Sequence, residues 1–285
     1  MTALRQEHPT LSVTRLCTLL GISRSSWYAW LKAPTQAERD ADLVARIQTI
    51  VARYRRYGYR RVLAVLQRSE RPVGKSRVQR VMRTYNLGVK KRKRRTTTTV
   101  TSGPSRYAPN RLRGLAVTRC DQVWVTDVTF LTMPRGFVYL ACVLDRWSRR
   151  CLGWAVDWHL TTNLVLTALN TAIALRHPAP GLILHSDQGT TYTSLDYQAR
   201  LSEIGAVCSM SAKGTPVENA VIESFFSTLK QEEVDWQDYQ TLTEAEQLLQ
   251  QFIVYYNRDR HHSSLGNEAP ITFELAEATS RQTEL

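Results

Sequence analysis

The chain has 285 residues, 43% of them hydrophobic and 22% charged, which is enough for two or more domains with a substantial core. Its five cysteines are scattered and form no Cys-x-x-Cys pair, so we expect neither a disulfide framework nor a structural zinc site. The first ten residues lack the apolar run of a signal peptide, and the longest apolar stretch, residues 137–144, is too short to cross a bilayer; a soluble, cytoplasmic protein is predicted.

The net charge of +13 is unevenly distributed along the chain. Residues 1–119 hold 27 Lys and Arg against 5 Asp and Glu, whereas residues 120–285 hold 11 against 20. The basic part favours a nucleic acid as partner, because Lys and Arg neutralise backbone phosphates. The acidic part predicts a domain whose carboxylates have a different task, such as binding metal ions.

Residues 1–34 have the pattern of a helix-turn-helix. Apolar residues recur at helical spacing over residues 11–20, Gly21 interrupts them, and Ser23 offers the N-cap of a second helix that contains Trp27 and Trp30. A short helix pair with a glycine turn either binds DNA or is a packing unit, and the pattern alone favours neither interpretation.

A second helix-turn-helix is predicted over residues 38–88, with helices at residues 43–54, 60–68 and 76–85. In its last helix the stripe expected to be buried consists of Val78, Val81, Met82 and Tyr85. The other faces carry three arginines that we expect to contact DNA, namely Arg77, Arg80 and Arg83. Scattered arginines usually mark a solvated face, but the scarcity of nearby acids favours DNA here.

Residues 89–118 predict a flexible basic linker, because they have no apolar periodicity that would support a core face. Such a tether also neutralises the charge of DNA and strengthens binding in a salt-dependent way. Its residues expected to contact DNA are Lys90, Lys91, Arg92, Lys93, Arg94 and Arg95.

An α/β domain is predicted over residues 119–236. Three strands with short turns are followed by alternating helices and strands, at residues 122–133, 137–144, 151–156, 162–176, 182–186, 195–204 and 206–210, and by a helix from Ala220. The order βββ-α-β-α-β-α is that of the RNase H-like fold, a mixed five-stranded sheet with flanking helices. Residues 237–285 predict a C-terminal helical extension.

Three carboxylates stand on separate elements of this domain. Asp127 lies in the first strand, Asp187 ends an apolar strand, and Glu223 opens an amphipathic helix. Such a set is what a two-magnesium phosphoryl-transfer site requires, since hard cations bind oxygen ligands. Lys230 shares the helix face of Glu223 and is available for a DNA phosphate, although both residues also fit an ordinary surface. His185, on the strand face of Asp187, fits a packed histidine, a metal ligand or a general base.

Three long motifs resemble one protein family. They are Trp124-Val125-Thr126-Asp127-Val128-Thr129, residues 185–194 and residues 218–230. In this order they resemble the integrase core of bacterial insertion-sequence transposases, in particular the orfB-type proteins of insertion-sequence family three, which are relatives of retroviral integrases. Residues 57–61 are similar to that family's second helix-turn-helix, and residues 256–270 to its C-terminal signature. The chain departs from the family pattern at Glu218, where Asp is usual, and at Asn267, where Tyr is frequent.

The resemblance implies that the three carboxylates are catalytic Asp-Asp-Glu ligands of two Mg²⁺ ions, with Mn²⁺ as an alternative, and that Lys230 contacts the DNA end. Arg260 and His262, in the C-terminal signature, are expected to contact DNA as well. The implied protein is a bacterial, nucleoid-associated transposase that binds the terminal inverted repeats of its element and cleaves and transfers DNA strands. A homo-oligomer on paired DNA ends is implied too.

Two other functions compete with this prediction. A plain RNase H-like nuclease hydrolyses DNA but does not join strands, and a DNA-binding regulator with a vestigial core would be unaffected by Asp187→Asn. The intact carboxylate set disfavours the regulator. Neither a membrane nor a small-molecule substrate is expected. The end sequence, the subunit number and a frameshifted fusion are not predictable from these residues.

Overall fold

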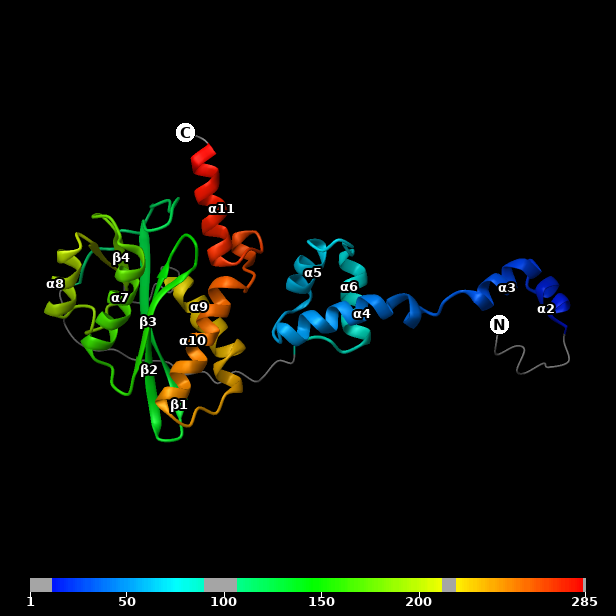
Figure 1. Ribbon diagram of the computed structural model, residues 1–285, viewed down its shortest axis with the longest axis horizontal. Helices are drawn as coiled ribbons and strands as arrows, with labels where there is room; N and C mark the ends of the chain where they lie inside the picture. The colour runs from blue at the N-terminus through cyan, green and yellow to red at the C-terminus, as the bar shows by residue number, and fades with distance from the viewer. Residues whose placement is uncertain (1–11, 90–106, 212–218, 284–285) are drawn as a thin grey trace. The chain divides into compact units, whose positions relative to one another are not determined.

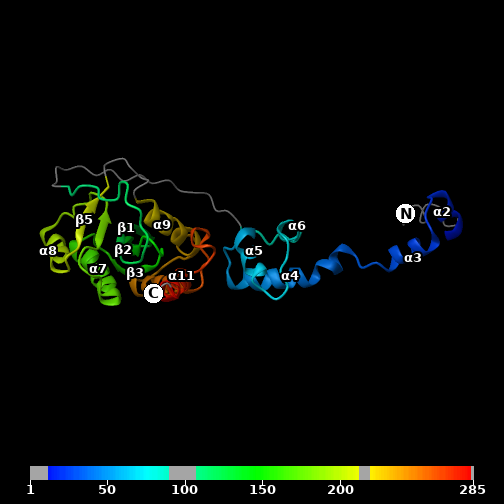
Figure 2. The same cartoon turned by 90° about the horizontal axis from the view of Figure 1, so that it is seen from above.

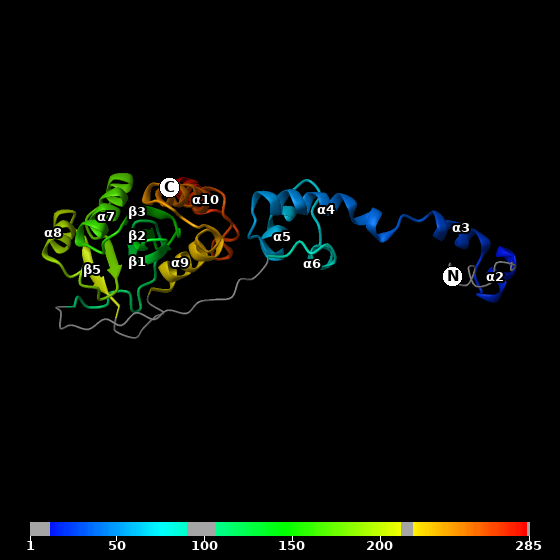
Figure 3. The same ribbon diagram turned by 90° about the horizontal axis from the view of Figure 1, so that it is seen from below.

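The computed structural model describes residues 12–89, 107–211 and 219–283, and the chain divides into two compact units, Met1–Lys91 and Arg92–Leu285. Figures 1, 2 and 3 show the elements of each unit from three directions. The predicted DNA contacts of residues 90–95, as well as Glu218, lie outside the described residues. None of the helices in the described ranges combines the length and the apolar character that a bilayer crossing needs.

The first helix pair forms where the apolar spacing predicts it. Helix α2 (Val13–Leu19) begins after Ser12, and α3 (Arg24–Lys32) begins after Ser23, whose hydroxyl accepts a hydrogen bond from the backbone N–H of Ser26. Gly21 joins the helices with a positive φ of 65°, which glycine adopts without strain. Trp27 is buried, whereas Trp30 is half exposed at 51%.

Helices α4 (Gln36–Arg53), α5 (Tyr59–Gln67) and α6 (Lys75–Thr84) form a small three-helix core. The first of them begins seven residues before the predicted start because Thr35 and Glu38 form a capping box. The stripe predicted on α6 is confirmed for Val78, Val81 and Met82, which are buried. Tyr85 is the C-cap of α6 and is 37% exposed, so the prediction that it is buried is wrong.

The second unit contains the predicted mixed five-stranded sheet with flanking helices, in the order β3-β2-β1-β4-β5. The strands are β1 (Val123–Met133), β2 (Gly136–Asp145), β3 (Cys151–Asp157), β4 (Ile183–Ser186) and β5 (Val207–Met210). The first three are antiparallel, and β4 and β5 run parallel to β1. The predicted RNase H-like arrangement is therefore confirmed.

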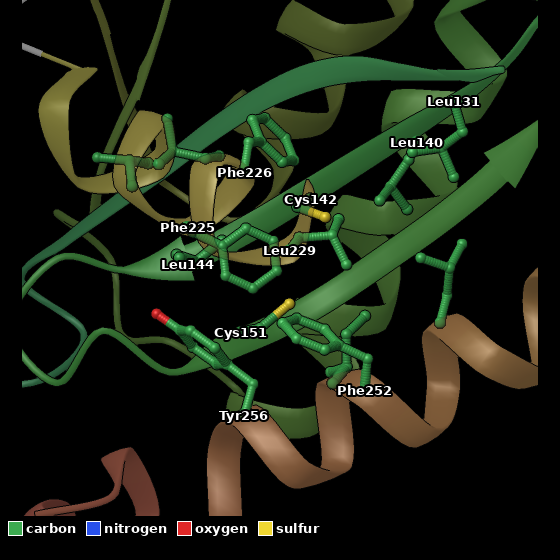
Figure 4. Packing of buried hydrophobic residues seen from close by; sticks show 14 of the residues in the cluster. Leu131, Leu140, Cys142, Leu144, Cys151, Phe225, Phe226, Leu229, Phe252 and Tyr256 are labelled. Atoms are coloured by element: carbon green, nitrogen blue, oxygen red, sulfur yellow. The ribbon is translucent and has the colours of Figure 1, made fainter. Parts of the chain in front are cut away.

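Helices cover both faces of this sheet (Figure 1). Helices α7 (Thr162–Arg176) and α8 (Leu195–Glu203) pack on the face of Trp124 and Val143. Gly153 on β3 allows α7 to approach closely, because a Cβ at Gly153 would overlap the carbonyl oxygen of Ala168. The opposite face carries Cys142 and Leu144 and is covered by α9 (Ala220–Glu232) and α10 (Leu242–Arg258). Figure 4 shows the aromatic side chains of α9 and α10 against that face.

The C-terminal part is fastened to the sheet through α10 and α11 (Pro270–Thr283), with the short helices η2 (Val234–Trp236) and η3 (Ser263–Leu265) between α9 and α11. Phe252 and Tyr256 of α10 belong to the same hydrophobic core as α9. Glu274 of α11 accepts hydrogen bonds from the side chains of Ser148, Arg150 and Arg176. Residues after 236 are thus integrated into the core, and the boundaries expected at residues 34, 88, 118 and 236 stay predictions.

Candidate active site

Asp127 on β1 and Asp187, the residue after β4, lie at the same level of the sheet. The parallel register pairs Val123 with Ile183 and Val125 with His185. Continuing this register by two residues places Asp187 beside Asp127. Because parallel neighbours lie about 4.8 Å apart and partners at one level point to the same face, the two carboxylates are neighbours.

Both aspartates belong to the sheet face that α9 covers. Val123 and Val125 pack with Ile222 of α9, and strand alternation puts Asp127 on their side of the sheet. Glu223 follows Ile222 in the first turn of α9, and its side chain is exposed. Two strands and one helix therefore bring the three predicted carboxylates to one region, although they are far apart in the sequence.

The charge of Asp127 is destabilised by its surroundings. Burial, together with the negative charges of Asp187 and Glu223, raises its pKa to about 7, against a hydrogen bond from the Val128 N–H at 2.8 Å and the positive charge of Lys230. The charges of both other acids thus act on Asp127, in agreement with the register of β1 and β4. Negative charge accumulates here, and among the described residues no ion pair neutralises it.

Asp187 has a different local environment. Burial raises its pKa, and the backbone N–H of Gly189 opposes this shift by donating to its Oδ1 at 2.9 Å. A Cβ at position 189 would stand only 2.9 Å from the same oxygen, so glycine permits this close approach of the backbone. Gly189 is a site residue that the sequence-based reasoning missed, although it stands two residues after Asp187 in the second motif.

The donor set fits a hard divalent cation. All three side chains are carboxylates, which Mg²⁺ and Mn²⁺ prefer, and a cation would relieve the repulsion that raises the pKa of Asp127. Across the described ranges, no group of three or more His, Cys, Asp and Glu side chains stands in a metal-binding arrangement. The carboxylates are thus gathered without being in ligand positions, and Glu223, with the longest and most exposed side chain, has the most freedom to move.

Lys230 lies on α9, two turns after Glu223. Its Nζ is 5.0 Å from the centre of the Phe130 ring, which is a cation–π contact, and Phe130 packs edge-on against Phe137. Burial lowers the pKa of Lys230, while the charge of Asp127 raises it. The structure therefore places Lys230 beside the carboxylates, with an aromatic contact that restrains its side chain.

His185 is buried and hydrogen-bonded. Its Nδ1 is 2.9 Å from the hydroxyl of Ser209 on β5, and this hydroxyl also accepts the backbone N–H of Arg111 at 3.0 Å. These contacts tie β4, β5 and the segment before β1 together. Of the three interpretations left open by the sequence, the packed histidine agrees best with this environment.

Two of the three arginines predicted to contact DNA through α6 are engaged within their own unit. Arg80 makes a bidentate ion pair with the buried Asp40 of α4, at 2.6 and 2.8 Å, and Arg77 donates to the backbone carbonyl of Arg39 at 2.6 Å. Both side chains keep more than 40% exposure, at 42% and 48%. Arg83 is exposed and forms no ion pair among the described residues. A DNA contact is thus easiest for Arg83.

Arg260 and His262 are buried, at 4% and 9% exposure. The Arg260 guanidinium donates to both carboxylate oxygens of Glu232 at 2.9 Å and lies over the ring of Tyr256. It therefore joins the chain after α10 to the end of α9. Their polar groups are engaged inside the domain, which leaves little surface for DNA, and DNA contact by these two residues stays a prediction.

Comparisons with known proteins agree with this architecture. The integrase core domain family matches residues 117–216, a second integrase core domain family matches residues 205–270, and an HTH-like domain family matches residues 37–95. The chain is 35% identical over 242 residues to the transposase for insertion sequence element IS904 of Lactococcus lactis, which covers 84% of this chain and 95% of that protein.

Two further similarities concern an insertion sequence and a retroviral enzyme. Over 270 residues the chain is 30% identical to the transposase InsF for insertion sequence IS3A of Escherichia coli, covering 92% of this chain and 94% of that protein. The catalytic core domain of BIV integrase aligns with a TM-score of 0.45 and 19% identity, over 57% of this chain and 99% of that one.

Proposed function

We infer the reaction from the family: this chain belongs to the IS3-type transposases of insertion sequences and is a DDE polynucleotidyl transferase with an integrase core. We propose that it binds the terminal inverted repeats of its element, cleaves a DNA strand there and joins the released end to a second strand. The observation that carries this proposal is the common level and face of Asp127 and Asp187, with Glu223 on the helix above them.

In this proposal Asp127, Asp187 and Glu223 are the catalytic residues, and they would hold two Mg²⁺ ions, or Mn²⁺ in their place. When bound, the cations supply Lewis-acid stabilisation of the attacking and the leaving oxygen. The hydrogen bonds from Val128 and Gly189 fix the orientation of the two aspartate carboxylates before DNA arrives. Ionised carboxylates are needed to hold cations. Because the pKa of Asp127 is raised, the affinity of the site for cations should fall as the pH decreases.

Two displacements at phosphorus account for the reaction. In the first, the oxygen of water attacks the phosphodiester in line, the bond to the 3′ oxygen breaks, and a 3′-hydroxyl and a 5′-phosphate result. In the second, that 3′-hydroxyl attacks a phosphodiester of another strand, a new bond forms, and the displaced 3′ oxygen leaves with a proton. No covalent protein intermediate is needed. Lys230 would hold a phosphate of the DNA end beside the carboxylates.

DNA binding is proposed to reside mainly in the basic first half of the chain. Residues 38–88 would form the DNA-binding module, with Arg83 as its most accessible arginine, and residues 89–118 a basic linker that follows the phosphate backbone. Two element ends in one reaction imply at least two copies, so a homo-oligomer on paired ends is proposed. The substrate of the enzyme would be bacterial DNA in the nucleoid, because the relatives named above are insertion-sequence proteins of bacteria.

The deciding experiment uses labelled duplex DNA with the element end, either intact or already cut to a 3′-hydroxyl, in Mg²⁺, Mn²⁺ or EDTA. The wild-type chain is expected to cut the intact DNA and to join the pre-cut DNA to a second duplex. Asp127→Asn, Asp187→Asn and Glu223→Gln should lose both reactions, while the control Asp196→Asn, an exposed acid on α8, should keep them. Cutting without joining would favour the nuclease, and an active Asp187→Asn chain would refute the catalytic assignment.

A further inference from the structure

A second site of unpaired charge lies in the same unit, away from the carboxylates. It is a cavity of about 270 Å³ at the end of the sheet where β1 begins. The turn after β2 supplies Arg146, Trp147 and Arg149, the segment before β1 supplies Leu115, and the first turn of α11 supplies Phe273. The cavity walls thus combine apolar surface with two guanidinium groups.

Three hydrogen-bond donors around this cavity are buried and have no partner in the part of the chain that the structure describes. They are Nη1 of Arg146, Nε of Arg149 and Nε1 of Trp147. Buried donors in native proteins are nearly always paired, and an unpaired one requires an explanation such as a bound ion. Three of them in one turn, two on positive side chains, point to an absent acceptor with negative charge.

The carboxylates nearby are already engaged. Asp145 accepts the backbone N–H groups of Asp121, Trp147 and Ser148 at 2.7 to 2.8 Å. Glu274 is paired with Arg150 at 2.6 Å and also with Arg176. Within the described ranges no acid forms an ion pair with the two arginines that line the cavity.

Electrostatics agrees with this geometry. Burial lowers the pKa of both Arg146 and Arg149, because each guanidinium loses solvent without gaining a counter-ion. Asp145 acts on Arg149 in the opposite direction, but its oxygens are committed to backbone donors. An arriving anion would meet two guanidinium groups that are already partly desolvated.

We propose that this cavity binds an oxyanion, namely a backbone phosphate of the DNA on which the enzyme acts. Guanidinium groups match the oxygens of phosphate with several fixed N–H donors, and such charge-assisted hydrogen bonds are strong. The backbone N–H of Arg146 donates to the carbonyl of Val123 at 2.9 Å, which fixes the cavity four residues along β1 from Asp127. At the rise of a strand this is about 13 Å, or about four base-pair steps of B-DNA.

The site is distinct from the carboxylates, so its role is positional: it would hold DNA beside the reacting strand. Leu115, Trp147 and Phe273 form the apolar part of the cavity wall. A carboxylate of another protein chain would accept hydrogen bonds from the same donors. The activity of the family on DNA favours phosphate.

The first test measures thermal unfolding of the full chain in sodium phosphate and in sodium chloride of equal ionic strength. Phosphate should raise the melting temperature of the wild type, since an anion that binds only the folded state stabilises it. The double variant Arg146→Gln/Arg149→Gln should lose that increase, whereas the control Arg135→Gln, on the exposed β1–β2 turn, should keep it. Trp147→Phe removes one donor, keeps the aromatic contact with Phe273 and should show a reduced increase.

The second test measures the affinity for duplex DNA as a function of salt. Loss of one phosphate contact should reduce the slope of log K against log salt by about 1 in the double variant, with no change in Arg135→Gln. An equal phosphate effect on all variants would overturn the site. Loss of the phosphate effect with an unchanged DNA slope would overturn DNA as the ligand and favour an acidic protein partner. Neither readout requires strand transfer, so a failure here leaves the proposed reaction untouched.

Discussion

Two aspartates in this chain show opposite responses to their surroundings. Asp40 on α4 is 1% exposed, and hydrogen bonds from Arg80 and Gln36 hold its pKa well below the usual range. Asp127 on β1 is partly buried, and burial together with the charges of Asp187 and Glu223 raises its pKa to about 7. Both aspartates lie in regular secondary structure. Their pKa values shift in opposite directions because Asp40 faces a positive charge, whereas Asp127 faces two negative charges.

The comparison distinguishes a charge that the fold neutralises from one that it leaves for a ligand. Asp40 and Arg80 join α4 to α6, so their interaction is complete within the protein. The charge of Asp127 is opposed by like charges, an arrangement that proteins build mainly where a substrate or a metal ion completes it. The same distinction separates the paired Arg260 from Arg146 and Arg149.

The largest expected effect is on chemistry. Asp127→Asn should lower the rate of strand transfer by roughly 1000-fold or more, because a ligand needed in the transition state is lost. Asp40→Asn, measured at saturating DNA, should keep that rate, because Asp40 supports a helical unit and no metal. Single-turnover joining of pre-cut DNA in Mg²⁺ is the measurement. If the joining rate fell equally in the two variants, the assignment of Asp127 as a catalytic residue and of Asp40 as a structural one would be wrong.

The next effect concerns a neutralised pair in the core. Glu232→Gln leaves the Arg260 guanidinium buried at 5% exposure without its counter-ion, and breaking such a pair costs about 3 to 5 kcal/mol. Urea unfolding of the full chain, followed through the core transition, measures this. Glu203→Gln is the matched control, since Glu203 is exposed and its partner Arg200 is a partly exposed neighbour on the same helix, and such surface pairs contribute at most about 1 kcal/mol. Similar losses in both variants would contradict the assignment of Arg260 to the core.

The fold and the three carboxylates could be predicted because both depend on local regularities. Alternation along β1 and the helical period of α9 fix which residues face the core, and this in turn fixes where Asp127 and Glu223 point. The parallel neighbour of β1 could only be inferred from the order of the elements. Its register, which places Asp187 beside Asp127, appears only in the structure.

The arginines show where such reasoning ends. The period of α6 indicates that Arg77 and Arg80 are not in the apolar stripe, but it does not reveal that α4 presents Asp40 to them. Likewise an arginine such as Arg260 is a residue type that often contacts DNA. Its actual partner, Glu232, stands 28 residues away in the sequence. Pairing across elements is decided by packing, which no local pattern encodes. The capping box at Thr35 was readable in the sequence and was missed.

A smaller effect should appear in the pH dependence of stability without metal. For Asp127 the folded pKa of about 7 lies above the unfolded value near 4, so the folded state binds the extra proton. The contribution of this protonated carboxyl to the free energy of unfolding is therefore complete below about pH 4 and is lost as the pH rises to about 7. In EDTA, Asp127→Asn should therefore stabilise the core by up to about 4 kcal/mol at pH 8 and have little effect at pH 4. Urea unfolding at both pH values, with Asp196→Asn as the control, measures the difference. A loss of stability at pH 8 would contradict the account of this site.

The smallest effect is expected for Asp40, and it has the opposite sign. Its folded pKa lies below the unfolded value, so the stability it contributes is present above about pH 4 and is lost at lower pH. Asp40→Asn should therefore weaken the contact of α6 with α4 at pH 7, and amide hydrogen exchange in α6 should become several-fold faster. Exchange in β1 should stay unchanged, because β1 belongs to the other unit. Asp42→Asn is the matched control, since Asp42 is exposed at 68% and its contact with Arg46 is 3.8 Å long. If α6 were instead protected to the same degree in both variants, the two arginines on α6 would be free of Asp40 in solution and available for DNA, as their place on the helix first suggested.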